Sequence, residues 1–489
     1  MMKYILALSC YIVLVSSGLT AQEYPKVVLR GDYADPSIIR DGKDYYMTHS
    51  PFLYSPGYLI WHSTDLEHWE PICRAMPEMI GNAMAPDLVK YRDTFYIYIP
   101  SAKSNWVILA KNIRGPWSKP INLKVGKIDP GHAVGEDGKR YLFLSGGNRI
   151  KLTDNGLTTI GKMENVYTGW KFPKEWKTEG KWLESPKIIK HGEYFYLTCA
   201  QGGTAGPPTS HMVISARSKS INGPWENSPY NPIVHTYSAN EKWWSKGHGT
   251  LIDDINGNWW IVYHAYQNGF YSLGRQTLIE PIKWTKDGWF KTTKQPIKTL
   301  PASDIKTSGF SLSDNFTGKK IGLQWTAWRK FDNTSIKIRN NRLFLKAKGD
   351  NPADGQLLLV TPQDTAYSTQ VTLKATSNTR GGLILFYNEK AFAGMEMGMN
   401  SLIIYCKAKR SKTILLKNNP AITLKIENHS NKCTFSYSVD GKKWEVADNN
   451  IDASDMQHNN YKGFLAIRVG LLASGKGWVE YNNFIYSPF

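Results

Sequence analysis

One short pattern recurs five times in the first three hundred residues, and it restricts the possible folds more than any other feature of the chain. Each copy is a turn rich in Asp, Gly or Asn that leads directly into an aromatic β-strand. The copies are residues 41–47, 92–97, 137–143, 191–197 and 256–262. They begin roughly 45–65 residues apart, which is the length of one four-stranded propeller blade. The pattern therefore predicts an all-β chain whose first part, residues 22–291, is a five-bladed β-propeller.

The repeat ends near residue 291, and a second kind of pattern follows. Residues 292–308 contain two prolines and no strand pattern, which predicts a linker. Beyond it, short runs of alternating apolar and polar residues are separated by polar turns. This alternation is typical of a β-sandwich, which we expect over residues 309–489.

The amino terminus has the features of a cleaved export signal. A basic start at Lys3 is followed by an apolar run over residues 4–15 and by small residues up to Ala21. The run is too short for a stable membrane span, and no other span is predicted. Residues 1–21 are therefore predicted to be removed, and the mature protein is expected in the periplasm or outside the cell.

Charge and cysteine content narrow the function classes. The formal net charge is +19, but the lysines are scattered, and no basic helix or zinc-ligand spacing accompanies them. We therefore expect no nucleic-acid partner; a solvated basic surface explains the charge, and attraction to an acidic polysaccharide is a weaker interpretation. The four cysteines beyond the signal, Cys73, Cys199, Cys406 and Cys433, have no disulfide-framework spacing and are predicted to be buried free thiols.

Chemically active residues stand a few positions before each repeated turn. The innermost strand of every propeller blade runs along the central axis, so residues at this point in all five blades converge on one pocket. The residues are Asp35, Asp87, Asp129, Glu184 and His248. The sequence thus predicts four carboxyl groups and one imidazole around the axis.

Clustered carboxylates repel each other, so a stable fold gains nothing from them. Glycoside hydrolysis uses such a cluster: one acid protonates the leaving oxygen, one carboxylate activates water or attacks the sugar, and a third can tune the acid. A calcium site is the main alternative, since carboxylates also bind hard cations. The absence of a compact Asp- and Asn-rich loop argues against it.

At these positions the sequence resembles glycoside hydrolase family 43 over about residues 24–290. Asp35, in Tyr-Ala-Asp-Pro-Ser-Ile, is similar to the segment of the family's catalytic base. Asp129, in Ile-Asp-Pro-Gly, is similar to its pKa modulator, and Glu184, in Leu-Glu-Ser-Pro-Lys, to its general acid. The resemblance implies a catalytic carboxylate trio and no requirement for an organic cofactor.

The resemblance extends to residues outside the trio. His248, in Gly-His-Gly-Thr, is similar to the axial histidine that family members place near a calcium ion or an ordered water, which leaves a structural calcium near the axis open. Arg275, in Ser-Leu-Gly-Arg, is similar to a sugar-contacting arginine. The C-terminal region resembles the accessory β-sandwich, of jelly-roll or concanavalin-like type, in the family's xylosidase and arabinofuranosidase branches.

Three further side chains are candidates for substrate contact. Phe52 and Trp106 could stack on a sugar, although core packing explains each of them equally well. Asp87 could accept a hydrogen bond from a substrate hydroxyl or could close a turn.

The sequence as a whole predicts an exo-acting, inverting glycosidase that releases a terminal pentose from a plant polysaccharide. Because Ser185 and Lys187 replace the Gly and His found in xylosidases, α-L-arabinofuranose is favoured over β-D-xylopyranose, and β-D-xylosidase is the alternative. A retaining, fructan-cleaving propeller is disfavoured because Ile128, rather than an arginine, precedes Asp129. An alternative of another class is a carbohydrate-binding propeller without catalysis.

Overall fold

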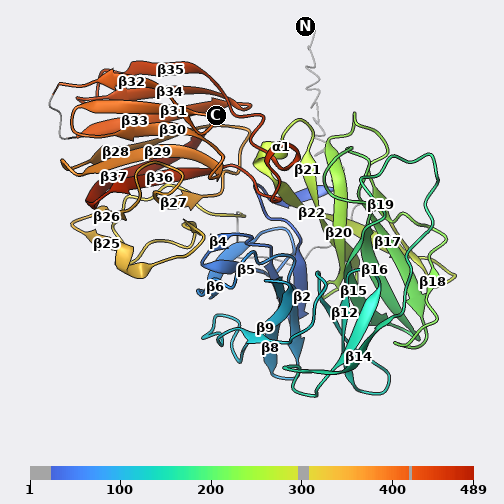
Figure 1. Ribbon diagram of the computed structural model, residues 1–489. Coiled ribbons are helices and arrows are strands. Elements are labelled where there is room, and N and C mark those ends of the chain that lie inside the picture. Colours follow the sequence, from blue (N-terminus) through green and yellow to red (C-terminus); the bar gives the residue numbers. More distant parts are fainter. Residues whose placement is uncertain (1–23, 296–304, 306–307, 418–420) are drawn as a thin grey trace, which may run out of the picture.

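The computed structural model describes residues 24–295, 305, 308–417 and 421–489. These residues form two β-rich parts, shown in Figure 1 in blue to green and in yellow to red. The predicted signal segment lies outside the described residues, as does most of the predicted linker. No helix among the described residues is both long and apolar enough to cross a membrane.

The first part is the predicted five-bladed propeller, built from five antiparallel sheets. The first blade contains, from the axis outward, β2 (Ser37–Asp41), β3 (Asp44–Thr48), β5 (Gly57–Ser63) and β6 (Glu70–Met76). The second contains β7 (Asp87–Tyr91), β8 (Thr94–Ser101), β9 (Ser104–Ala110) and β10 (Ile121–Asn122). The third contains β11 (Gly131–Val134), β12 (Arg140–Leu144), β13 (Asn148–Leu152) and β14 (Thr159–Asn165).

The remaining two blades have extra strands. The fourth contains β15 (Leu183–His191), β16 (Tyr194–Gln201), β17 (Met212–Ser218) and β18 (Glu226–Asn227), with β19 (Val234–His235) also paired to β17. The fifth contains β20 (Trp243–Asp253), β21 (Trp259–Gln267), β22 (Arg275–Trp284) and β1 (Lys26–Leu29), with β23 (Phe290–Thr292) also paired to β22 and a 3-10 turn, η1 (Tyr271–Leu273), before β22. In every blade the predicted turn joins the first strand to the second.

The fifth blade closes the ring with the start of the chain. β1 pairs antiparallel with β22, with Val27 opposite Leu278. Val28, Leu29 and Ile279 are buried together in one core cluster with Trp61 and Trp69 of the first blade. The first and last blades are thus joined by hydrogen bonds and by apolar packing, a closure that the repeat pattern did not predict.

The second part is the predicted sandwich. One sheet has the order β25 (Ile336–Arg339), β26 (Arg342–Ala347), β37 (Gly477–Pro488), β28 (Ala366–Lys374), β33 (Ile422–His429), β34 (Lys432–Ser438) and β35 (Glu445–Asp452). The other has the order β27 (Gln356–Val360), β36 (Arg468–Gly475), β29 (Thr379–Asn388), β30 (Ala391–Met397), β31 (Ser401–Cys406) and β32 (Lys409–Leu415). In β28, Tyr367, Thr369, Val371 and Leu373 alternate with less buried residues, so one face of the strand packs on the other sheet.

The two parts share a small sheet. β4 (Tyr54–Ser55), in the loop between β3 and β5, pairs with β24 (Ala327–Trp328) of the second part. A 3-10 turn, η2 (Asn333–Ser335), follows β24, and a single helical turn, α1 (His458–Tyr461), lies beside the fifth blade in Figure 1. The sandwich therefore holds a loop of the first blade that begins immediately after β3.

The prediction that the cysteines are buried free thiols is confirmed in part. All four cysteines in the described residues are free; Cys199 and Cys433 are buried, whereas Cys73 and Cys406 are only half-buried.

Candidate active site

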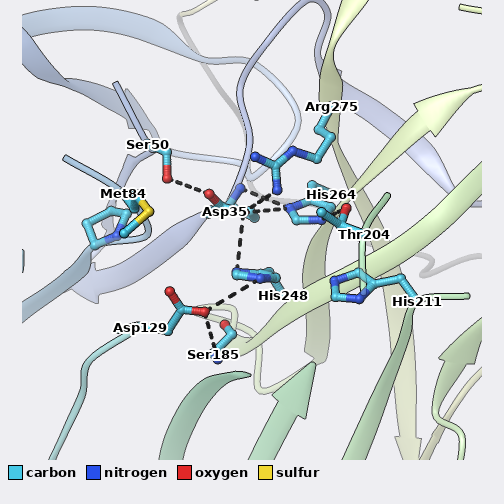
Figure 2. Close-up of polar contacts among 12 residues, drawn as sticks. Asp35, Ser50, Met84, Asp129, Ser185, Thr204, His211, His248, His264 and Arg275 are labelled. Carbon is cyan, nitrogen blue, oxygen red and sulfur yellow. Dashed lines mark hydrogen bonds and ion pairs between the residues drawn. The ribbon is translucent and has the colours of Figure 1, made fainter. Parts of the chain in front are cut away.

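The predicted axial residues lie at the same end of the five innermost strands. Asp35 stands two residues before β2, Asp87 begins β7, Asp129 stands two residues before β11, Glu184 is the second residue of β15, and His248 lies within β20. The structure therefore brings together residues that are more than two hundred positions apart in the sequence. Figure 2 shows Asp35, His248 and Asp129 joined in a chain of contacts across the axis.

Left-handed backbone recurs at this level of the axis. Asp35, Asp129, Ser185 and His248 have φ angles of 59°, 55°, 50° and 55°. This region is unfavourable for residues other than glycine, and such residues concentrate at functional sites. Asp35 and Asp129 stand just before β2 and β11, whereas Ser185 and His248 lie at register shifts within β15 and β20.

Asp35 is the most constrained carboxylate of the cluster. Its Oδ1 lies 2.8 Å from Arg275 Nη1, and its Oδ2 accepts a hydrogen bond of 2.5 Å from Ser50 Oγ. Burial alone would raise the pKa of Asp35, but the Arg275 guanidinium beside it holds that pKa well below its usual range. Asp35 is therefore ionised near neutral pH.

Buried histidines surround this carboxylate. The backbone N–H of Asp35 donates to His264 Nδ1 (3.0 Å), and His248 Nδ1 lies 3.3 Å from Asp35 Oδ1. Burial lowers the pKa of His211, His248 and His264 to about 3 in each case. All three imidazoles are therefore neutral near pH 7, and they shape the pocket without adding charge.

Asp129 and Glu184 form the opposite half of the cluster. Asp129 Oδ2 accepts a hydrogen bond from the backbone N–H of Ser185 (3.1 Å) and lies 3.8 Å from His248 Nε2. Burial, with the nearby carboxylates of Glu184 and Asp35, raises the pKa of Asp129 well above its usual range. Burial and the charge of Asp35 raise the pKa of Glu184 to about 7, although Arg275 opposes the shift.

The cluster is therefore electrostatically divided. Asp35, beside the guanidinium, carries a negative charge, while Glu184 can retain a proton near neutral pH. Environments that push two carboxyl pKa values apart supply a base and an acid at the same time. Glu184 is also less buried than Asp35 and Asp129, so the group that retains a proton faces the solvent side of the pocket.

Asp87 and Lys187 form a buried ion pair beneath the cluster. Lys187 Nζ lies 2.6 Å from Asp87 Oδ1 and donates to the carbonyl oxygens of Pro86 and Pro130 at 2.9 Å and 3.1 Å. The other oxygen of Asp87 accepts from the backbone N–H of His132 (2.6 Å). Protein donors therefore occupy both oxygens of Asp87, which favours its structural interpretation; contact with a sugar stays a prediction.

Asp87 and Lys187 also line a cavity of about 380 Å³ that follows the innermost strands away from the carboxylate cluster. Other parts of its lining are Ile38 and Leu88, which lie further along β2 and β7. The ion pair therefore separates the pocket from the remainder of the central channel.

The aromatic candidates lie in different surroundings. The Phe52 ring lies 5.4 Å from the guanidinium carbon of Arg275, at the edge of the carboxylate cluster. Trp106 is half-buried on β9, donates its indole N–H to Ser101 O (3.1 Å), and packs in the core between the first and second blades. Its contact with a sugar stays a prediction.

Several residues of the pocket were not predicted. Ser50 and His264 contact Asp35, and Phe464 of the sandwich places its ring 5.6 Å from the Arg275 guanidinium carbon. Ser50 belongs to the loop after β3, and His264 follows the fifth aromatic turn, so both lay near recognisable motifs. No sequence signal links Phe464 to the propeller, because that contact depends on how the two parts pack.

The donor atoms do not fit the calcium ion suggested near His248. Two groups of side chains could surround a cation: Asp35, His248 and His264, and Asp129, Glu184 and His248. Calcium takes six to eight oxygen ligands, whereas the first group offers two imidazole nitrogens and a carboxylate already paired with Arg275. The second group offers two carboxyl groups and one imidazole nitrogen, which is fewer oxygen ligands than calcium takes.

Comparison with known proteins gives two matching family models. Residues 24–290 match "Glycosyl hydrolases family 43", and residues 313–487 match "Beta xylosidase C-terminal Concanavalin A-like domain". A xylosidase/arabinosidase of Butyrivibrio fibrisolvens is 33% identical over 94% of this chain and 98% of its own length. A non-reducing end α-L-arabinofuranosidase of Bacteroides ovatus is 26% identical over 97% of each chain.

Two further matches concern a xylan 1,3-β-xylosidase and a solved structure. The xylosidase, from a Vibrio species, is 26% identical over 85% of this chain and 89% of its own length. The crystal structure of the GH43 protein BlXynB from Bacillus licheniformis superposes with a TM-score of 0.86 at 26% identity, covering 96% of this chain and 100% of that one. The similarity therefore includes both parts of the fold.

The Asp87–Lys187 pair can be tested by its contribution to stability. Lys187→Met should lower the free energy of unfolding by about 3–5 kcal/mol, because it leaves a buried carboxylate without its partner. Lys190→Met, on the exposed face of the same strand, should change it by less than about 0.5 kcal/mol. Urea unfolding at neutral pH measures both, and equal effects of the two substitutions would contradict a buried pair.

Proposed function

The chain belongs to glycosyl hydrolase family 43 and is a glycoside hydrolase, and from this premise we propose that it is an exo-acting, inverting α-L-arabinofuranosidase. The observation that carries the proposal is the division of charge between Asp35, held ionised by Arg275, and Glu184, whose pKa is raised to about 7. An inverting glycosidase needs one carboxylate and one carboxylic acid on opposite sides of the scissile bond. As a member of this family, the enzyme needs no catalytic cofactor.

The reaction assigns one role to each carboxyl group. Asp35 accepts a proton from a water molecule while the water oxygen bonds to the anomeric carbon. Glu184 donates its proton to the glycosidic oxygen as the bond to the leaving group breaks. Asp129 positions Glu184 by accepting the hydrogen bond from the Ser185 backbone N–H.

Arg275 and His248 support these steps without exchanging protons. Arg275 keeps Asp35 ionised before each turnover. His248, neutral and buried between Asp35 and Asp129, separates the base from the acid half of the cluster. No step of the mechanism passes through a metal ion.

The choice of sugar rests on the segment that contains the acid. In xylosidases of the family a histidine stands three residues after the acid, where this chain has Lys187. Its ammonium group is directed at Asp87, Pro86 and Pro130 beneath the pocket, so it supplies no imidazole to the pocket wall. This difference supports arabinofuranose as the released sugar.

β-D-Xylosidase activity is the second candidate, because relatives of comparable similarity are named for each activity. A binding propeller without catalysis is disfavoured, since all three carboxyl groups are present and their pKa values diverge.

The proposed setting of the enzyme follows from its amino terminus and charge. An export signal at residues 1–21 would deliver it to the periplasm or outside the cell. The net charge of +19 would favour encounter with acidic plant polysaccharides such as pectin, whose side chains carry arabinofuranose.

One experiment tests both the sugar and the stereochemistry. Nitrophenyl α-L-arabinofuranoside and β-D-xylopyranoside are compared by kcat/KM, and NMR identifies the first anomer released. We expect the arabinofuranoside to be the better substrate and the anomeric configuration to be inverted. A higher kcat/KM on the xyloside would select the second candidate, and retention would remove Asp35 from the role of base.

The pH profile should show the titration of Glu184. Only the protonated acid can donate, so kcat/KM on a poor leaving group should fall as the pH rises through about 7. Asp35 remains ionised far below this pH and imposes no loss between about pH 5 and about pH 7. A dinitrophenyl glycoside needs no protonation and should lack the alkaline loss; the same loss on both substrates would contradict the assignment.

Substitution separates the acid from the base. Glu184→Ala should lower kcat on a poor leaving group by about 10²–10⁴-fold and spare activated glycosides, whereas Asp35→Ala should abolish turnover of both. The control is Glu193→Ala, which removes an exposed carboxylate of the same blade and should leave kcat unchanged. If Glu184→Ala affected both substrate types equally, Glu184 would not be the acid.

A further inference from the structure

The segment that leads into β15 has an unusual composition. Residues 170–182 contain three tryptophans, and each stands next to a lysine: Trp170-Lys171, Trp176-Lys177 and Lys181-Trp182. With Lys174, the segment has four lysines against two glutamates. All four lysines are exposed, and none forms an ion pair with another residue in the described part of the chain.

Trp182 lies directly beside the proposed acid. Its carbonyl oxygen accepts a hydrogen bond from Gly202 N (3.1 Å), which extends the β15–β16 pairing one residue beyond Leu183. Two residues of extended chain span at most about 7 Å, and residues two apart in a strand point to the same face. Leu183 packs into the core of the fourth blade, so Trp182 and Glu184 face the opposite, open side.

The segment is fixed to the rest of the pocket. Gln201 accepts from Trp170 N (3.0 Å) and donates to Trp170 O (2.7 Å). Glu179 N donates to Ser210 Oγ (2.6 Å), and Glu179 Oε2 accepts from Ala205 N (3.0 Å). Ala205 and Ser210 belong to the loop after β16 that also carries His211, so the segment is anchored to a loop of the pocket itself.

One ring of the segment and one ring of a neighbouring segment are open to solvent. Trp182 is 56% exposed, and Tyr237, from the segment between β19 and β20, is 66% exposed. Trp176 is half-buried; it stacks on His235 at 4.4 Å and meets the Tyr237 ring edge-on at 6.1 Å. Large exposed rings next to a catalytic pocket offer flat apolar surfaces to a ligand.

We propose that residues 170–182 and Tyr237, here called the tryptophan–lysine rim, bind a uronate-bearing polysaccharide chain on the leaving-group side of the pocket. The proposal rests on the proposed function, in which Glu184 protonates the oxygen that joins the released sugar to this chain. The rings stack on the C–H faces of the sugar units, and the lysines pair with their carboxylates.

The lysines favour an acidic chain over a neutral one. A neutral chain would need only the rings, and the four exposed lysines of the segment would add nothing to its binding. A carboxylate within a few ångströms of these groups is attracted, and salt should weaken that attraction because the charges are exposed. The net charge of the whole protein acts in the same direction and raises the rate of encounter.

The test compares three substrates with the same terminal sugar: an aryl glycoside, a neutral oligosaccharide and a uronate-bearing oligosaccharide. Each result is expressed as kcat/KM relative to the aryl glycoside. Trp182→Ala should lower this ratio about tenfold for both oligosaccharides. Lys177→Gln/Lys181→Gln should lower it about three- to tenfold for the uronate-bearing substrate only, and about 0.5 M salt should remove the difference.

Matched controls lie elsewhere on the surface. Trp444→Ala removes an exposed tryptophan of the sandwich, and Lys190→Gln removes an exposed lysine of the fourth blade; neither should change the ratios. Equal loss on neutral and uronate-bearing substrates in the lysine variant would overturn the acidic ligand. Unchanged ratios in Trp182→Ala would overturn the rim.

The aryl glycoside distinguishes this proposal from the proposed function. If the unaltered enzyme hydrolyses the aryl glycoside but the variants change no ratio, only the rim is wrong. If no aryl glycoside is hydrolysed, the proposed function is wrong. In that case the rim is tested by binding, in a native gel that contains polygalacturonate. Polygalacturonate should retard the unaltered chain and Lys190→Gln, and it should retard the lysine variant less. Equal retardation of the two variants overturns the rim.

Discussion

The buried contact between Arg275 and Asp35 keeps one carboxylate of the pocket ionised where burial alone would neutralise it. Without the guanidinium, burial would favour a neutral Asp35, and the pocket would contain three carboxylic acids of similar character. With it, Asp35 stays ionised, and burial together with the negative charge of Asp35 raises the pKa values of Asp129 and Glu184 on the other side of His248. Burial and one guanidinium together thus give similar side chains different protonation states.

This contact depends on both parts of the fold. Arg275 begins β22 directly after η1, and Ser272 of η1 donates to Asn431 of the sandwich (2.6 Å) while its carbonyl accepts from Ile467 N (2.9 Å). On the other side of Asp35, Ser50 lies in the loop whose strand β4 pairs with β24. The sandwich therefore braces the residues on both sides of Asp35, and it also supplies Phe464.

The sequence predicted what a repeat can encode. Asp35, Asp129, Glu184 and His248 could be found because each precedes the same kind of turn, and five equivalent turns imply one common axis. Ser50 and His264 contact Asp35, but they occupy no equivalent position in the repeat, so the repeat pattern could not predict them. Phe464 and the pairing of β1 with β22 depend on contacts between segments hundreds of residues apart, where local propensity carries no information.

The ring closure by β1 has a consequence for synthesis of the chain. The first strand to be made can pair only after residues 275–284 exist, so it waits as an unpaired edge while four blades are completed. Arg275 lies at the start of that last partner strand, opposite Tyr266 of β21. The closed ring and the charge pattern at its centre therefore form together, late in synthesis. A nascent chain that ends within the fourth blade contains the carboxyl groups but not yet the guanidinium that separates their pKa values.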